Sequence, residues 1–308
     1  MFIGIDIGGS SIKIGATDGR DHVLAERAVV MKSLPDYEML CHAVCAAIKE
    51  IAGESGRPLA VGLAMPGFPD PRTGSLRDGG GNIPLFAGRG IVTSLRERLD
   101  LPVTVMNDGV AAAMAELQFG AGRGRKTFAV ITIGTGIGGC VVVDGRPKLG
   151  PNGEPPEFGA MVLDKDGPRN GRGLPGTLES FAAAPSFIRI YRALGGDRHI
   201  HHVRSLFERL PEDEIARRAV DAVALRLAQA IGLIANAVNL EACIIGGGVS
   251  AAGEMLLEPV RRHLPVFTWP LLLEGLVVCR ADFGNRAGMI GAAAHAAGFN
   301  RAAATAQR

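Results

Sequence analysis

The chain has 308 residues, 47% of them hydrophobic, so it is long enough for about two domains with buried cores. Its formal net charge is +2 and no long run has one sign, so nothing calls for nucleic acid or a membrane as a partner. The five cysteines form no CxxC pair, and the first residues show neither a basic region nor a cleavage site. We therefore expect a reduced, cytoplasmic protein without a signal peptide.

The first elements predicted along the chain are three short strands in an antiparallel meander, because apolar runs alternate with Gly-rich turns. The strands are expected over residues 2–7, 11–16 and 23–31. Apolar residues at helical spacing predict a helix over 36–52, and 59–65 is typical of a buried strand. A Gly- and Pro-rich loop follows over 67–90, and loops of this length are usually functional.

Residues 101–106 predict a strand that ends at Asn107-Asp108, where an alanine-rich helix begins. The rest of the chain repeats the plan of the first half. Strands are expected over 128–133, 139–143, 146–149 and 242–245, and helices over 212–239, 251–263 and 286–297. The pattern predicts two similar α/β domains with a cleft between them, where ligands usually bind. The last helix is expected to return to the first domain.

The turn Gly8-Gly9-Ser10 is a candidate phosphate site, because backbone N–H groups in a glycine turn can approach an anion without a Cβ in the way. Asp6 could hold Mg²⁺ through water, since this ion prefers few carboxylates together with phosphate oxygens. Lys13 could reach the transferred phosphoryl group. The alternative is a plain hairpin turn with a solvated lysine.

Two further glycine segments are candidates for nucleotide binding. Gly134-Thr135-Gly136 opens a glycine-rich turn between two strands, whereas a P-loop or dinucleotide fingerprint would open a helix. Gly246-Gly247-Gly248 lies between a strand and a helix and offers a flat surface to a nucleotide or its ribose. Packing turns are the alternative for both.

Carboxylates and amides near these turns suggest phosphoryl transfer to a polyol. Asp108 begins a helix whose dipole favours its ionised form, so it could accept a proton from an attacking hydroxyl. The alternative is that Asn107 or Asp108 only caps the helix. Glu157, Glu179 and Asn82 lie in or beside loops and could bond to paired sugar hydroxyls.

Taken together, the motifs resemble the ROK family (repressors, open reading frames and sugar kinases) of the actin/hexokinase superfamily. The matching segments are Asp6-Ile-Gly-Gly-Ser10, Asn107-Asp108, Glu116 with Phe119-Gly-Ala-Gly122, Gly134-Thr-Gly-Ile-Gly-Gly139, Glu157-Phe-Gly159, Leu178-Glu179, Gly246-Gly-Gly248 and Gly291-Ala-Ala293. The resemblance implies two ribonuclease-H-like α/β domains with mixed sheets that flank a central cleft. We assign 1–106 with the helix 286–308 to the first domain and 107–285 to the second.

The resemblance also implies roles for single residues. Asp108 would be the catalytic base, and Asn82, Asn107, Glu157 and Glu179 would hold the sugar. ATP would lie on the three glycine turns with Asp6 and Lys13, and Mg²⁺ would bridge its phosphates. A homodimer is typical of relatives.

One departure from the family pattern concerns a structural zinc, which most members bind through one His and three Cys. The corresponding positions here are Ala160, Asn170, Arg172 and Thr177. None supplies the thiolate or imidazole that a closed zinc site needs, so we predict no zinc. The family histidine also contacts the sugar, so its loss at Ala160 leaves the usual glucose specificity open.

These observations predict an ATP-dependent kinase that phosphorylates C6 of a hexose such as glucose. N-acetylhexosamines and a ketose are rival substrates, and polyphosphate is a rival donor, for which Arg169 and Arg172 would form a basic loop. A non-catalytic sugar sensor is a further alternative. A family repressor is disfavoured, because the core begins at Phe2 and leaves no room for a DNA-binding motif before it.

Overall fold

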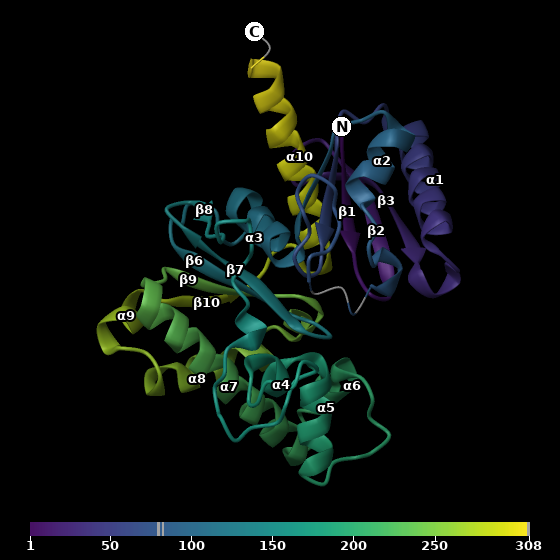
Figure 1. Ribbon diagram of the computed structural model, residues 1–308. Helices are drawn as coiled ribbons and strands as arrows, with labels where there is room; N and C mark the ends of the chain where they lie inside the picture. The colour runs from purple at the N-terminus through teal and green to yellow at the C-terminus, as the bar shows by residue number, and fades with distance from the viewer. Residues whose placement is uncertain (79–80, 82, 307–308) are drawn as a thin grey trace. The chain divides into compact units, whose positions relative to one another are not determined.

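The protein contains two five-stranded mixed sheets (Figure 1). The structure is a computed structural model that describes residues 1–78, 81 and 83–306, with side chains up to residue 300. The chain divides into two compact units. The first contains residues 1–123, 149–155 and 286–308, and the second contains 124–148 and 156–285. By this division residues 107–123 and 149–155 group with the N-terminal unit, whereas the sequence analysis placed them in the second domain. The domain boundaries themselves stay a prediction.

The sheet of the first unit has the strand order β3-β2-β1-β4-β5. Its strands are β1 (Phe2–Ile7), β2 (Ser11–Thr17), β3 (Val23–Val30), β4 (Val61–Met65) and β5 (Val103–Asn107). β1 runs antiparallel to β2 and parallel to β4, and β4 runs parallel to β5. The carboxyl ends of β1, β4 and β5 therefore meet at one edge of the sheet.

Alternation along β1 separates the two faces of this sheet. Ile3, Ile5 and Ile7 belong to the core under α1 (Tyr37–Ser55) and α2 (Ile91–Leu99). The opposite face carries Gly4, where a Cβ would lie only 1.9 Å from the carbonyl oxygen of Met289. Glycine thus lets α10 (Ala287–Ala306) lie directly on the sheet beside α3 (Asp108–Phe119), as Figure 1 shows.

The second unit repeats this plan with the strand order β10-β9-β6-β7-β8. Its strands are β6 (Phe128–Ile133), β7 (Ile137–Val143), β8 (Arg146–Pro147), β9 (Ala242–Gly246) and β10 (Val277–Arg280). Its helices are α4 (Leu178–Ala182), α5 (Ala184–Ala193), α6 (Val203–Glu208), α7 (Glu214–Val238), α8 (Glu254–His263) and α9 (Pro270–Gly275). The predicted pair of α/β units with mixed sheets is confirmed.

Helix α7 is the central helix of the second core. By length and composition it could cross a membrane, yet 61% of its most apolar window is buried inside the protein. Its apolar side packs with residues of β6, β9 and the neighbouring helices in one cluster. The helix therefore has the pattern of an interior helix of a folded unit.

Candidate active site

The first group of candidate residues lies at the carboxyl edge of the first sheet. Asp6 is in register with Ala64, and Ala64 with Met106, so the segments that follow β1, β4 and β5 emerge side by side. From β1 the sheet continues to β2 on one side and to β4 on the other. A position where the strand order changes direction in this way is a topological switch point. Open α/β sheets bind ligands beyond the carboxyl ends of the strands at such a point.

The β1–β2 turn is a tight hairpin in which the Gly8 N–H donates to the Ser11 carbonyl at 3.0 Å. Gly9 and Ser10 are exposed at its tip. Behind the turn Lys13 Nζ lies 3.7 Å from Asp6 Oδ2, because the two residues are paired across the strands. Burial raises the pKa of Asp6, and the charge of Lys13 opposes that rise.

The carboxylate of Asp6 also meets the first turn of α10. A Cβ on Gly288 would lie 2.9 Å from Asp6 Cγ, so a side chain at this position would displace the Asp6 carboxylate. No cluster of three metal-ligating side chains occurs among the described residues. A single carboxylate beside a phosphate turn suits Mg²⁺, which usually keeps several waters and takes its other ligands from phosphates.

Asn107 is the N-cap of α3. Its Oδ1 accepts from the N–H groups of Gly109 at 2.8 Å and Val110 at 3.2 Å, and its Nδ2 donates to the Gly67 carbonyl at 3.0 Å. The N-cap position that the sequence left open for this pair thus belongs to Asn107, and Asp108 Oδ1 also accepts from the Gly109 N–H at 2.8 Å. Asp108 is the first residue of the helix and is partly exposed at the sheet edge.

Of the other sugar-site predictions in this half of the chain, Asn82 lies outside the described residues. Its role as a sugar ligand stays a prediction. The role of Asn107 as a sugar ligand also stays a prediction, since its Nδ2 has a second hydrogen beyond the one given to Gly67.

The second group of candidates lies at the carboxyl ends of β6 and β9, which are parallel neighbours. The turn after β6 is closed by Gly134 N–H to Gly136 carbonyl at 3.0 Å. Gly247 has φ of 76°, and a Cβ there would lie 2.4 Å from the Ile133 carbonyl oxygen. The structure therefore brings the segments 134–136 and 246–248 together, and it explains why Gly247 has no side chain.

Glu179 braces the first of these turns. Its Oε2 accepts from the Ile137 N–H at 3.2 Å, and a Cβ on Gly136 would lie 2.6 Å from the same oxygen. A Cβ on Gly159 would lie 3.5 Å from Glu179 Cβ. The segment of Glu157, which is exposed, therefore packs beside that of Glu179.

A pocket of about 530 Å³ extends from the same turn, and sequence reasoning missed it. Its lining comprises Thr135, Ala184, Pro185, Ile188, Arg189, Arg192, His201, His202 and Val203. Arg189 donates to the Ser180 carbonyl, and Arg192 to the carbonyls of Arg198 and Ile200. Within the described part of the chain neither guanidinium pairs with a carboxylate.

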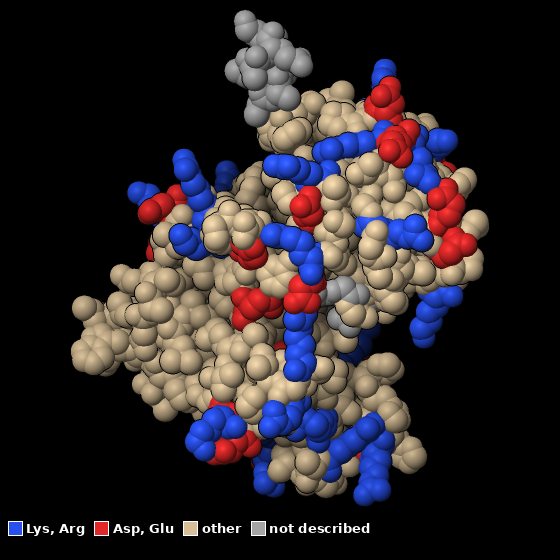
Figure 2. Space-filling model, in the orientation of Figure 1, with Lys and Arg blue, Asp and Glu red and all other residues tan. Residues whose placement is uncertain are grey.

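The surface around this pocket is basic. Lys and Arg side chains gather over the part formed by α5 and α6 (Figures 1 and 2). The sequence signal for this pocket is the strongly one-sided apolar pattern of α5, the helix that lines it. Chain order alone does not indicate that Thr135 lies beside this helix. The two are joined by Ala184 N–H to Gly134 carbonyl at 2.8 Å.

The loop where the family pattern has its zinc ligands is held here by other groups. Asn170 Oδ1 accepts from the N–H groups of Arg172 and Leu174, each at 3.0 Å. Thr177 caps α4 through Ser180 N–H at 3.2 Å. Arg169 donates to the Gly173 carbonyl at 2.5 Å. These residue types do not fit a zinc site, because none of them supplies a thiolate or an imidazole.

The two mixed sheets, each with a glycine turn at its topological switch point, define an actin/hexokinase-type fold. The model of the ROK family matches residues 2–298, and the chain belongs to this family. It is 31% identical to a glucokinase of Halalkalibacterium halodurans, over 94% of this chain and 93% of that one. It is 30% identical to an N-acetyl-D-glucosamine kinase of Escherichia coli, over 95% of this chain and 98% of that one.

A solved structure agrees with these relatives. The ROK glucokinase of Streptomyces griseus, in complex with glucose and AMPPNP, superposes with a TM-score of 0.82 at 29% identity and covers 96% of this chain and 98% of its own. Together the comparisons show that the protein is a sugar kinase.

Proposed function

We propose that the protein transfers the γ-phosphoryl group of ATP to C6 of a hexose such as glucose, with Asp108 as the general base. The observation that carries the proposal is that Asp108 begins α3 at the edge where the Gly8 turn also lies. The glucokinase relatives support glucose as the acceptor, and the AMPPNP bound to the Streptomyces griseus enzyme supports ATP as the donor.

In this mechanism the C6 oxygen attacks the γ-phosphorus and its proton passes to Asp108, while the bond to the β-phosphate breaks and ADP leaves with the electron pair. The N–H groups of the segments 8–10 and 134–136 would bind phosphate oxygens. Lys13 is proposed to contact the phosphates as well. Mg²⁺, held by Asp6 through water, would neutralise charge on the phosphates.

The pocket beside Thr135 is proposed to hold the base and ribose of ATP. Its apolar residues, Ala184, Pro185, Ile188 and Val203, offer a surface on which a purine can lie. The segment 246–248, which packs against the end of β6, would contact the ribose or phosphates.

Inorganic polyphosphate is a second candidate donor, and the basic rim of the same pocket favours it. Arg169, one of the two arginines predicted for this role, bonds to its own loop, whereas Arg189 and Arg192 line the pocket. The double variant Arg189→Gln/Arg192→Gln should raise the KM for polyphosphate by roughly tenfold and the KM for ATP far less. The exposed Arg218→Gln on α7 is the matched control.

Sugar hydroxyls are proposed to bond to Asn82, Asn107, Glu157 and Glu179. N-acetylglucosamine is the main rival acceptor, because a relative at 30% identity is a kinase of that sugar and because Ala160 replaces the histidine expected there. We further propose that the protein is cytoplasmic and forms a homodimer. Light scattering on the purified protein would measure its molar mass and so test the homodimer.

The test is an ATP-consumption assay on metal-stripped protein with Mg²⁺ restored, against a panel of hexoses, hexosamines and ketoses. We expect turnover with glucose, and Asp108→Asn should lower kcat by about 10²- to 10⁴-fold while sugar binding stays measurable. The exposed Asp21→Asn is the matched control. Full activity of Asp108→Asn would remove it as the base. Silence on the whole panel, with sugar still bound, would favour a sensor.

A further inference from the structure

The loop between Glu157 and Glu179 is folded back on itself. The N–H of Leu163 donates to the Gly176 carbonyl at 2.8 Å, and Val162 and Thr177 form an antiparallel bridge. Gly176 has φ of 52°, and a Cβ there would lie 1.5 Å from the Asp164 carbonyl oxygen. The two ends of the loop thus meet at 163–164 and 176–177, between the two glutamates.

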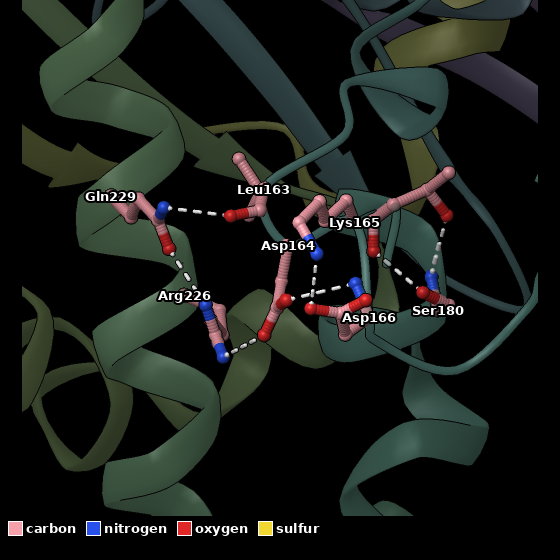
Figure 3. A network of polar contacts seen from close by, with 8 residues as sticks. Leu163, Asp164, Lys165, Asp166, Ser180, Arg226 and Gln229 are labelled. Atoms are coloured by element: carbon pink, nitrogen blue, oxygen red, sulfur yellow. Dashed lines mark hydrogen bonds and ion pairs between the residues drawn. The ribbon is translucent and has the colours of Figure 1, made fainter. Parts of the chain in front are cut away.

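One side chain of α7 ties this meeting point to the body of the second unit. Arg226 Nη2 lies 3.1 Å from Asp164 Oδ2, and Arg226 Nη1 donates to Gln229 Oε1 at 3.0 Å. Gln229 in turn donates to the Leu163 carbonyl at 3.1 Å. Figure 3 shows these contacts. The side chains of Arg226 and Gln229 both point toward the loop segment that carries Leu163 and Asp164.

The same guanidinium also reaches α4. Its central carbon lies 4.3 Å from the centroid of the Phe181 ring, and Phe181 is two residues after Glu179. A guanidinium is planar, donates in several directions and stacks on aromatic faces. Arg226 can therefore hold a carboxylate, an amide and a ring together, which a lysine cannot do. Its side chain is 27% exposed, so water screens these contacts only in part.

We propose that Arg226 is a positioning residue for sugar binding, because its contacts fix the two ends of the loop that joins Glu157 to Glu179. The proposal rests on the proposed roles of these two glutamates. It assigns Asp164, Gln229 and Phe181 as the partners through which Arg226 acts. A merely structural ion pair on the surface would contribute little and would leave substrate affinity unchanged.

The first test is kinetic. Arg226→Met keeps the length of the side chain but removes its charge and donors. At a temperature well below unfolding, it should raise the sugar KM by roughly tenfold and leave the ATP KM and kcat within about threefold of wild type. Arg226→Lys should restore part of the loss. Arg217→Met, which breaks a 2.8 Å pair with Glu214 at the start of the same helix, is the matched control.

The second test needs no sugar turnover. Amide hydrogen exchange should be faster by about tenfold at Leu163 and Ile137 in Arg226→Met, because the first N–H bonds within the loop and the second bonds to Glu179. The exchange rates of the amides in β6 should be the same in Arg226→Met and in wild type. Unaltered exchange at both positions would overturn the proposal, as would faster exchange with an unchanged sugar KM. Faster exchange in an enzyme that phosphorylates no sugar would show that the proposed function fails while the anchoring by Arg226 stands.

Discussion

Gly291 in α10 lies so close to α3 that a Cβ on it would be 1.8 Å from the carbonyl oxygen of Ala111. No side chain fits at that distance, so the two helix backbones touch. The contact links function to packing, because α3 begins at the proposed base Asp108 and the first turn of α10 meets Asp6. The position of both carboxylates thus depends on a glycine that contacts neither of them.

Replacement of this glycine should be strongly destabilising. In Gly291→Ala the new methyl group would meet backbone, which cannot rotate away, so we expect a loss of about 3 kcal/mol or more in unfolding free energy. Chemical unfolding measures this, and kcat should fall as well. Gly298→Ala in the same helix is the control, since nothing lies within 4 Å, and it should stabilise by about 0.5–1 kcal/mol. Equal effects of the two variants would contradict this account.

Two glycines of the turn after β6 should affect different substrates. In Gly136→Ala the Cβ would lie 2.6 Å from Glu179 Oε2, so the carboxylate must move and lose its bond to Ile137 N–H. We expect the sugar KM to rise by roughly tenfold.

Gly134→Ala has no protein atom within 4 Å of its Cβ, so the fold should be unaffected. If phosphate oxygens approach this turn, the methyl group would obstruct them and raise the ATP KM. Steady-state kinetics with each substrate varied in turn would separate the two effects. A rise in the same KM for both variants would count against the assignment of Glu179 to the sugar.

Removal of metal should distinguish this protein from relatives with the zinc motif. Dialysis against a strong chelator, followed by return of Mg²⁺, should change neither the thermal midpoint nor the sugar KM. The reason is that Ala160, Asn170, Arg172 and Thr177 offer no thiolate or imidazole. Elemental analysis of the purified protein should find zinc well below one equivalent. A stoichiometric zinc whose loss lowers the thermal midpoint would refute the expectation.

The plan of the fold could be predicted from local signals. The glycine turns at 8–10 and 134–136 separate apolar runs of strand length, so both hairpins followed from turn chemistry and alternation. The helix over 36–52 followed from apolar spacing, and it begins after Asp36, whose side chain caps Met39 N–H at 2.8 Å. The observed ends of the strands differ from the predicted ends by up to two residues, because the hydrogen bonds to the neighbouring strand determine where a strand ends.

The helix at 91–99 was not predicted, because it is short and its polar and charged residues leave only a brief apolar pattern.

Contacts between distant segments could not be predicted from the sequence either. Arg226 is 62 residues from Asp164, and nothing near either residue indicates that they pair. Asn107 could be a cap or a sugar ligand by its sequence context, and only the three-dimensional contact with Gly67 assigned its amide group.

The last prediction concerns acid stability. Tyr191 is buried and donates to Asp213 Oδ2 at 2.6 Å, while Asp213 Oδ1 accepts from Ala216 N–H at 3.0 Å as the N-cap of α7. The hydrogen bond from Tyr191 is the main cause that lowers the pKa of Asp213 below its ordinary value of 3.8. The stabilisation is therefore complete above the unfolded pKa and is lost as the pH falls through the lower folded pKa.

Asp213→Asn should lose about 1–2 kcal/mol of unfolding free energy at pH 7, because the negative charge at the start of α7 and the charge-assisted bond from Tyr191 are both lost. The difference from wild type should shrink as the pH falls below 3.8, because Asp213 then takes up a proton in the unfolded chain, whereas the folded carboxylate, with its lower pKa, stays ionised to a lower pH. Tyr191→Phe keeps the cap and should show a smaller loss with the same trend. Urea unfolding at pH 7 and at pH 3 measures both. A difference that stays constant between these two pH values would mean that the carboxylate charge of Asp213 does not stabilise the fold.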